Sequence, residues 1–192
     1  DFNLRNVLKC HIKNISSKLK KDHNIIIRSS VFPGTMEIIN KILKKKQLKN
    51  ISYCPERIVQ GYAVKELKNL PQIISAFNKS SEQKAINIFS KITKKIIVNS
   101  IIEAEMVKLI SNSWRYIQFA SANQFFMICS QHNINFNKIR KIMTDSYSRG
   151  KGLPSAGFAA GPCLLKDTMQ LYSFSKNIFS MGNASMLINE GM

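Results

Sequence analysis

The sequence predicts an α/β fold in its first half and a mainly α-helical second half. Between residues 23 and 98, short β-branched segments alternate with amphipathic helical segments, which is typical of a parallel sheet whose strands are connected by helices. After about residue 100 the strand signals end, and a stretch of some thirty residues contains neither proline nor glycine. Such a stretch favours one long helix. We therefore predict two domains, over residues 1–99 and 100–192.

Each element of the first domain has a local signature. The segment Ile25–Arg28 is rich in isoleucine and predicts a strand that runs into a turn at Pro33 and Gly34. Thr35 is expected to cap the next helix, because the apolar residues of "MEIINKILKK" repeat at helical spacing. Another helix, with a serine cap, is predicted in "SSEQKAINIFSKITKK". Further strands are predicted within residues 50–61, 72–77 and 96–98.

The second domain opens with the predicted long helix, "IIEAEMVKLISNSWRYIQFASANQFFMICSQHN". Its apolar residues lie on nearly every side, so we expect it to be buried between domains or between subunits. A shorter helix is predicted in "NFNKIRKIMTDSYS", followed by a loop rich in glycine, proline and serine over residues 149–162. The last helix is expected to begin near Asp167.

Composition narrows the classes of protein that fit. No apolar run reaches the roughly 18–20 residues that a membrane helix needs, and no signal peptide is visible. The net charge of +18 comes from lysines scattered without interleaved aromatic residues, which favours an anionic small molecule over nucleic acid. We expect neither a nucleic-acid partner nor a membrane. The opening "DFNLRNVLKC" lacks an initiator methionine and resembles a helix already begun, so we expect a piece of a longer protein.

The cysteines indicate the compartment. Cys10, Cys54, Cys129 and Cys163 are far apart and form no C-x-x-C pair or cluster with histidine. This spacing argues against a zinc site and gives no disulfide framework. We therefore expect no metal and a reducing, cytoplasmic location.

One cysteine lies in an unusual stretch, "GFAAGPCLLKD". Small residues precede Cys163, and Lys166 and Asp167 follow it. A buried structural cysteine needs neither feature, whereas a thiolate that meets a substrate benefits from both. Taken alone, Cys163 is also compatible with a small buried hydrophobic residue.

A polar stripe on the predicted long helix is the second candidate feature. Glu105, Lys108 and Asn112 are three and then four residues apart, so they fall within an arc of about 60° on one helix face. Their neighbours are apolar, which leaves functional and purely structural pairing both open. Glu56, which follows Pro55 at the end of a predicted strand, lies where parallel sheets bind ligands. No G-x-G-x-x-G fingerprint occurs, so any phosphate-binding turn is expected before residue 1.

Together, four segments resemble the nucleotide-sugar 6-dehydrogenase family, which includes UDP-glucose dehydrogenase and GDP-mannose dehydrogenase. The segments are "SSVFPGT", "CPERIVQG", "EMVKLISNS" and "GFAAGPCLLKDT", in the family's order and approximate spacing. The resemblance covers about residues 20–192 and is most similar to the UDP-N-acetylhexosamine branch. It implies the later part of a Rossmann-like NAD domain, followed by a mainly α-helical central domain with a long helix.

The resemblance implies that Cys163 carries the reaction intermediates. Enzymes of this family use NAD to oxidise the C6 hydroxyl of a sugar to a carboxylate, and a UDP-N-acetylhexosamine or UDP-hexose is the implied substrate. The Cys163 thiolate would trap the aldehyde as a thiohemiacetal, whose oxidation gives a thioester. Lys108 would stabilise the oxyanion and Asn112 would hold the intermediate or its water, and all three would contact the substrate. Asp167 would assist proton transfer, and Glu56 would act as general base or position the hydrolytic water.

The same resemblance assigns binding residues. Ser30, Glu56 and Lys166 correspond to positions on the cofactor side, with Ser30 in place of the more frequent threonine. Arg149 and Gly157 belong to the stretch that lies over the sugar nucleotide. The small residues before the cysteine would let the sugar approach the sulfur; they are Gly157, Ala159, Ala160 and Gly161.

Besides Ser30, two further positions depart from the family pattern. Gln60 stands where the UDP-glucose branch has a second glutamate, which argues against a mechanism that needs both acids, and Gln124 stands where relatives commonly have glutamate. In relatives the long helix packs against its twin, so a homodimer is expected for the complete enzyme. The product would enter surface polysaccharide synthesis, and residues 1–192 alone are expected to show little or no activity.

Two alternatives stay open at this point. A β-hydroxyacid-type NAD dehydrogenase shares a Rossmann domain, a long helix and a Lys-x-x-x-Asn pair, but it needs no cysteine. A non-catalytic dimerisation fragment is the other alternative. The intact set of Cys163, Lys108, Asn112 and Asp167 argues against long decay of the site.

Overall fold

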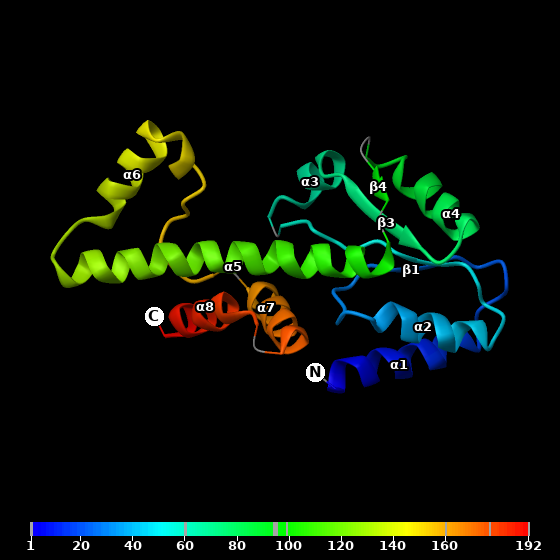
Figure 1. The fold of residues 1–192 in the computed structure, drawn as a ribbon. Helices are drawn as coiled ribbons and strands as arrows, with labels where there is room; N and C mark the ends of the chain where they lie inside the picture. Colours follow the sequence, from blue (N-terminus) through cyan, green and yellow to red (C-terminus); the bar gives the residue numbers. More distant parts are fainter. Residues whose placement is uncertain are drawn as a thin grey trace. The chain divides into compact units, whose positions relative to one another are not determined.

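A computed structural model describes the fold over most of the chain (Figure 1). The described residues are 2–59, 61–93, 96–98, 100–159, 161–176 and 178–191, with side chains throughout except at 2–6 and 98. Gln60 and Ala160, both considered above, lie outside the described residues. The chain forms two compact units, residues 1–108 and 109–192, and the division falls within one long helix, α5 (Ile101–Gln131).

Within the described residues, the first unit contains a four-stranded sheet whose strands follow their order in the chain. β1 pairs with β2 in parallel, and β3 pairs with β4 in parallel. The α/β class predicted from the sequence is therefore confirmed. The strands are β1 (Ile25–Ile27), β2 (Ile51–Tyr53), β3 (Gln72–Ala76) and β4 (Ile96–Val98).

The central pair of strands differs from the parallel sheet that the sequence predicts. β2 and β3 run antiparallel, with Tyr53 opposite Ser75. Their connection, residues 54–71, contains the short helix α3 (Ala63–Asn69), which has no buried residue. Because α3 does not pack as a buried crossover, the chain re-enters the sheet at the edge it left. The start of β3 therefore lies at the same edge as the ends of β1 and β2.

Helices cover both faces of this sheet (Figure 1). The first two pack together over one face, and α4 lies over the other, where Ala85 and Phe89 join a small buried cluster with Ile74. Successive strand residues point to opposite faces, so β1 and β3 each contribute isoleucines to both clusters. The helices are α1 (Phe2–Ser16), α2 (Thr35–Lys44) and α4 (Lys79–Phe89).

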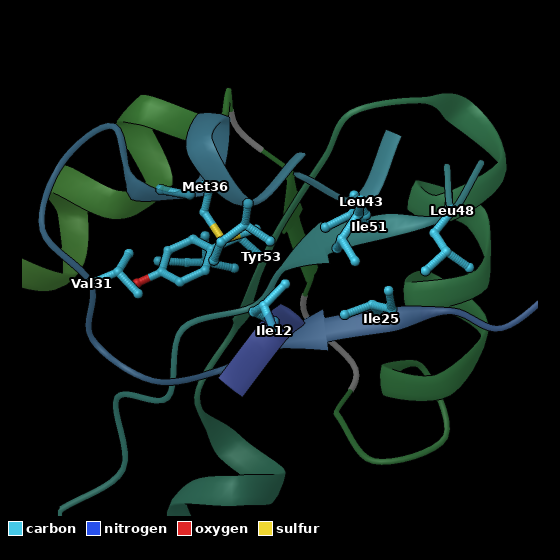
Figure 2. Packing of buried hydrophobic residues seen from close by; sticks show 11 residues of the cluster. Ile12, Ile25, Val31, Met36, Leu43, Leu48, Ile51 and Tyr53 are labelled. Atoms are coloured by element: carbon cyan, nitrogen blue, oxygen red, sulfur yellow. The ribbon is translucent and has the colours of Figure 1, made fainter. Parts of the chain in front are cut away.

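The larger hydrophobic cluster fills the space between α1, α2 and the sheet (Figure 2). Met36, Ile39 and Leu43 of α2 recur at helical spacing and share the face that meets the strands. Ile51 and Tyr53 of β2 enter the same cluster, and all five side chains are fully buried. This packing fixes β1 and β2, whose carboxyl ends bear predicted site residues.

The start of α2 differs from the sequence prediction. Gly34, and not Thr35, is the N-cap, with a φ of +82° that favours glycine, and Thr35 is the first helical residue. The Glu105 carboxylate of α5 closes this helix end instead. It accepts hydrogen bonds from the backbone N–H of Gly34 at 2.7 Å and of Met36 at 2.8 Å. An acceptor about seventy residues away in sequence therefore replaces the local cap.

The start of α4 also differs, because Asn78 rather than a serine is its N-cap. The Asn78 side-chain oxygen accepts a hydrogen bond from the backbone N–H of Ser81 at 2.8 Å. Asparagine is among the best N-cap residues, and the predicted serines lie in the first turn of the helix instead.

The second unit is helical in its described residues. α7 begins at Pro162 and not near Asp167, since proline fits the first turn of a helix, where its missing N–H is not needed. The sequence prediction also lacked a separate helix after α7. The elements that follow α5 are α6 (Phe136–Ser146), the 3₁₀ helix η1 (Ser148–Gly150), α7 (Pro162–Ser175) and α8 (Ser180–Glu190).

α5 is confirmed as a single long helix, but part of it is not buried within this chain. Four successive apolar residues near its carboxyl end are each at least 40% exposed: Phe125, Phe126, Met127 and Ile128. Among the described residues, no helix is both long enough and apolar enough to cross a lipid bilayer.

Candidate active site

A polar cluster lies at the edge of the sheet where β1 and β2 end. Arg28 follows β1, Glu56 lies just beyond β2 and Gln72 begins β3. The backbone ladder continues to this point, because the N–H of Glu56 donates to the carbonyl of Arg28 at 3.1 Å. The Arg28 guanidinium forms an ion pair with the Glu56 carboxylate and donates to Gln72 Oε1 at 3.3 Å. Glu56 is therefore held at the carboxyl edge of the parallel pair.

Both carboxylate oxygens of Glu56 accept hydrogen bonds, as an ionised glutamate does. Oε2 faces Arg28, while Oε1 accepts from the backbone N–H of Arg57 at 2.9 Å and of Ile58 at 3.0 Å. The side chain is still 40% exposed, so water reaches it. A cavity of about 20 Å³ adjoins it, which is room for one water molecule. Glu56 is thus held in one orientation and is accessible to water.

Ser30 lies half-buried in the loop between β1 and α2. The amino terminus of a helix is a common site for phosphate. In this chain the Glu105 carboxylate already accepts from Gly34 and Met36 at the start of α2, so that terminus is closed to a phosphate. The start of α2 therefore does not fit the diphosphate of a dinucleotide, while the Ser30 hydroxyl at the carboxyl edge of the sheet has the chemistry to hydrogen-bond another part of it.

The polar stripe predicted on the long helix divides into two roles. Glu105 has the structural role given above. Lys108 and Asn112 are four residues apart on α5, so their side chains leave one helix face a turn apart. Lys108 is half-buried at the end of the first unit, and Asn112 is buried in the second.

In the second unit, Asn112 pairs with Asp167 of α7. The Asn112 Nδ2 donates to Asp167 Oδ2 at 2.6 Å, and the Asp167 side chain is fully buried. The other oxygen, Oδ1, lies 3.0 Å from the Nζ of Lys166, whose side chain is 40% exposed. A buried carboxylate needs such partners, so Asp167 is held by an amide on one side and an ammonium on the other.

Cys163 lies in the first turn of α7, directly after Pro162, and is exposed. Asp167 is the fourth residue after Cys163, so the two side chains leave the same face of α7. The amino terminus of a helix stabilises negative charge, which suits a thiolate. The helix is entered through Gly161, whose φ of +77° favours glycine although the space around it is open.

The other cysteines have different surroundings. Cys54 is fully buried beside β2, and this burial raises the pKa of its thiol to about 12. Cys10 is exposed on α1, and Cys129 is half-buried on α5. Among the described residues, no three His, Cys, Asp or Glu side chains group in a way that could hold a metal ion.

The loop before α7 contains the predicted substrate-side residues. Arg149 is exposed, with its guanidinium 5.2 Å from the centre of the Tyr147 ring. Gly157 is held through its backbone, as both its N–H and its carbonyl hydrogen-bond to the side chain of Asn123. A pocket of about 300 Å³ borders the end of this loop, and its lining includes Phe158, Gly161 and Glu190.

Comparison with known proteins decides the family. Residues 2–93 match the NAD binding domain of the UDP-glucose/GDP-mannose dehydrogenase family, and residues 102–190 match the central domain of the same family. The chain belongs to this family. The resemblance found in the sequence motifs is thus confirmed over nearly the whole chain.

Relatives in this dehydrogenase family are longer than the chain. UDP-N-acetyl-D-mannosamine dehydrogenase of Methanocaldococcus jannaschii is 31% identical over 167 residues, which cover 86% of the chain and 39% of that protein. The Pyrococcus horikoshii protein of the same name is 28% identical over 94% of the chain and 45% of its own length. A solved structure of UDP-D-ManNAc dehydrogenase from Pyrococcus horikoshii has a TM-score of 0.87 and 26% identity, covering 96% of the chain and 46% of that structure. The chain spans less than half the length of these relatives.

Within each unit of the chain, the structure brings some predicted residues together. In the second unit, Asp167 contacts both Asn112 and Lys166, and Cys163 lies on α7 with Asp167. In the first unit, Glu56 is brought together with Arg28, which the sequence analysis did not select.

The sequence analysis missed two residues that contact predicted site residues: Arg28 in the first unit, which contacts Glu56, and Asn123 in the second, which contacts Gly157. Arg28 satisfies the strand-end criterion that selected Glu56, so the same signal could have found it. Asn123 lies eleven residues after Asn112, which places it only about 20° away around α5. The polar face predicted from Lys108 and Asn112 therefore continues further along the helix than we expected.

Proposed function

We propose that this chain belongs to an NAD-dependent enzyme that oxidises the C6 hydroxyl of a UDP-N-acetylhexosamine to the uronate. Family membership supports NAD as cofactor, and the names of the relatives make UDP-N-acetyl-D-mannosamine the first substrate to test. The observation that carries the proposal is the face of α7. There an exposed Cys163 lies one turn before a buried Asp167 that is paired with Asn112.

Cys163 is the nucleophile in this proposal. The first oxidation converts the C6 alcohol to an aldehyde, and the thiolate adds to that carbon to form a thiohemiacetal. The second oxidation removes a hydride from the same carbon and leaves a thioester. Water then attacks the thioester, the C–S bond breaks, and the carboxylate and the free thiolate are released. Two NAD molecules, bound one after the other, would each accept one hydride, so that two NADH leave for each uronate formed.

Lys108, Asn112 and Asp167 manage charge and protons around this carbon. Lys108 provides a positive charge for the developing alkoxide and oxyanion. Asn112 is held by Asp167 at 2.6 Å, which fixes the orientation of its amide toward the intermediate or an ordered water. Asp167 assists proton transfer through water and Lys108.

Glu56 serves the hydrolytic step. It is ion-paired with Arg28, partly exposed and next to a cavity with room for one water molecule, which suits a general base or a water-positioning group. Arg28 and the two backbone amides keep its carboxylate in one orientation.

The remaining predicted residues bind the two ligands. Ser30, Glu56 and Lys166 contact the cofactor side, and the partial exposure of Lys166 is consistent with such a contact. Arg149 and Gly157 belong to the segment that covers the sugar nucleotide.

The assembly and setting also belong to this proposal. The complete enzyme is a homodimer in which α5 packs against its twin, and the exposed apolar residues 125–128 support this arrangement. The Rossmann-like and helical domains divide near residue 99. The free cysteines favour a reducing, cytoplasmic setting, and the uronate serves synthesis of surface polysaccharide precursors.

The test is a coupled assay of the whole protein that contains residues 1–192. UDP-N-acetyl-D-mannosamine, UDP-N-acetyl-D-glucosamine and UDP-glucose are supplied with NAD, and NADH and uronate are measured together. We expect two NADH for each uronate with one of the acetamido sugars. Residues 1–192 alone are expected to show little or no turnover.

Cys163→Ser separates this proposal from a dehydrogenase that does not use the cysteine. We expect the variant to form no uronate, whereas Cys129→Ser, the matched control, retains activity. Uronate formation by Cys163→Ser at the unmodified protein's rate would contradict the proposal.

A further inference from the structure

A buried amide network links three parts of the second unit. Asn123 of α5 is fully buried, and its Nδ2 donates to Asn189 Oδ1 of α8 at 2.9 Å. Asn189 in turn donates from Nδ2 to the backbone carbonyl of Tyr116 at 3.0 Å. The Tyr116 hydroxyl donates to Glu190 Oε1 at 2.7 Å. These bonds hold the Asn123 side chain of α5 against α8.

The same Asn123 amide also hydrogen-bonds to the loop that leads to α7. Its Oδ1 accepts from the backbone N–H of Gly157 at 2.8 Å, and its Nδ2 donates to the Gly157 carbonyl at 3.1 Å. A side-chain amide that satisfies both backbone groups of one residue imitates the pairing of a β-ladder. Gly157 is thus held in place by a side chain from a distant part of the sequence.

Few other bonds anchor this loop. In its described residues, 151–159 and 161, the other hydrogen bonds to the backbone both reach Leu153. Its N–H donates to the Gly150 carbonyl at 3.1 Å, and its carbonyl accepts from Arg140 Nε at 3.1 Å. Among these described loop residues, the Asn123 clasp, defined as its two bonds to Gly157, is therefore the hydrogen-bonded anchor closest in sequence to Cys163.

The backbone of Gly157 explains why a fixed point is useful there. Its φ of +146° is a conformation that L side chains rarely adopt, and nothing lies within 4 Å of a Cβ built at this position. Glycine is therefore required by the backbone and not by lack of space. A glycine is also the residue with the most conformational freedom to lose, so an external restraint is needed to hold one conformation.

We propose that Asn123 is a positioning residue that fixes the Gly157 turn, so that the following segment presents Cys163 to the C6 carbon. The proposal rests on the proposed function for the role of Cys163. Asn123 touches neither substrate nor cofactor in this account. It acts through Gly157 and the loop that enters α7.

The first test needs no catalysis and uses the 192-residue chain. Asn123→Asp keeps the shape and the acceptor for the Gly157 N–H, but it loses the donor to the Gly157 carbonyl and to Asn189. Asn123→Ala loses the whole clasp, and Gln124→Ala changes the exposed neighbour as a matched control. Amide hydrogen exchange at Gly157 and backbone order at Cys163 are measured by NMR.

We expect Gly157 exchange to accelerate about tenfold or more in Asn123→Ala and less in Asn123→Asp, with reduced backbone order at Cys163 in both. Gln124→Ala should leave both quantities unchanged. Unchanged order at Cys163 in a folded Asn123→Asp chain would overturn the proposal. If Asn123→Ala fails to fold, Asn123→Asp alone decides the question.

The second test measures how the two oxidations divide in the whole protein that contains this chain. A displaced Cys163 lets the aldehyde escape, so Asn123→Asp should release aldehyde that hydroxylamine traps, with uronate yield falling about tenfold relative to NADH. A purely structural defect lowers both oxidations together and releases no aldehyde, which would overturn the proposal. If the unmodified protein oxidises no UDP-sugar, the proposed function fails, while the exchange test still decides the role of Asn123.

Discussion

At the scale of single residues, the two thiols at Cys54 and Cys163 differ in burial. Burial raises the pKa of Cys54 to about 12, so this thiol stays protonated throughout the ordinary pH range. Cys163 is exposed in the first turn of α7. Since the thiolate is the nucleophile, we expect iodoacetamide at pH 8 to modify Cys163 and to spare Cys54 in the folded chain.

Peptide mass spectrometry after timed quenching measures this difference. Cys10, which is also exposed, serves as an internal control for accessible thiols. Unfolding the chain in urea should make Cys54 reactive as well. Modification of Cys54 and Cys163 at similar rates before unfolding would contradict the burial of Cys54.

We expect Asn112 and Asp167 to be coupled in their contributions to the free energy of unfolding. Both side chains are buried, and removal of either leaves the other without its short hydrogen bond. A double-mutant cycle with Asn112→Ala and Asp167→Ala should give a coupling free energy of about 1–3 kcal/mol in urea unfolding. Additive effects of the two substitutions would show that the pair does not contribute to stability.

The sequence predicted which residues belong to the candidate site better than it predicted which of them contact each other. The motif around Cys163 selected Asp167, and the helical spacing selected Lys108 and Asn112. Neither signal revealed that Asn112 and Asp167 bond to each other, because their contact depends on how α5 and α7 pack. Arg28 was missed because its significance comes from the adjacent strand end that bears Glu56.

At the scale of elements, the start of α2 depends on Glu105 of α5. Its buried carboxylate accepts hydrogen bonds from the N–H groups of Gly34 and Met36. Glu105→Gln replaces one acceptor oxygen by a donor that faces backbone N–H groups. We expect the free energy of unfolding to fall by about 1–3 kcal/mol.

Glu37→Gln is the matched control, because Glu37 is exposed in the first turn of α2 and makes the same change in charge. It should change stability by less than about 0.5 kcal/mol, as surface substitutions usually do. Urea unfolding followed by circular dichroism measures both variants. Equal losses in the two variants would mean that the buried carboxylate has no special role at this helix end.

Helix starts illustrate the physical limit of prediction from local sequence. Thr35 has the right chemistry for a cap, yet Glu105 closes α2 from a distant part of the chain. α7 begins at Pro162 because proline is compatible with a first turn, although the sequence suggested a start near Asp167. The antiparallel pairing of β2 and β3 likewise depends on the failure of α3 to pack on the sheet, which periodicity does not reveal.

At the scale of the whole molecule, the fold class was predictable because two long-range signals agree. Strand and helix alternation extends to residue 98, and an unbroken helical stretch follows it. The family's NAD binding domain matches residues 2–93, and its central domain matches residues 102–190. The assembly of the protein was harder to predict from one sequence. An apolar helix face is equally compatible with burial against another domain and with burial against another subunit.

The proposed homodimer makes a prediction at this scale. Phe125 is 47% exposed on α5, and a charge there would be buried in a helix-to-helix interface. We expect Phe125→Asp to weaken dimerisation of the whole protein by at least tenfold in analytical ultracentrifugation. Gln124→Glu, an exposed neighbour, should change it little. A stable monomer before substitution, or no effect of Phe125→Asp on a dimer, would contradict an interface through this part of α5.

The central claim concerns a covalent bond between Cys163 and C6 of the sugar, and acid-quenched mass spectrometry measures that bond directly. The whole protein with Glu56→Gln, in which hydrolysis should be slow, is mixed with NAD and the aldehyde form of the UDP-sugar and then quenched in acid. We predict that the uronyl group is found as a thioester on the peptide that contains Cys163. Uronate released while Cys163 stays unmodified, or a uronyl group on another residue, would contradict the account.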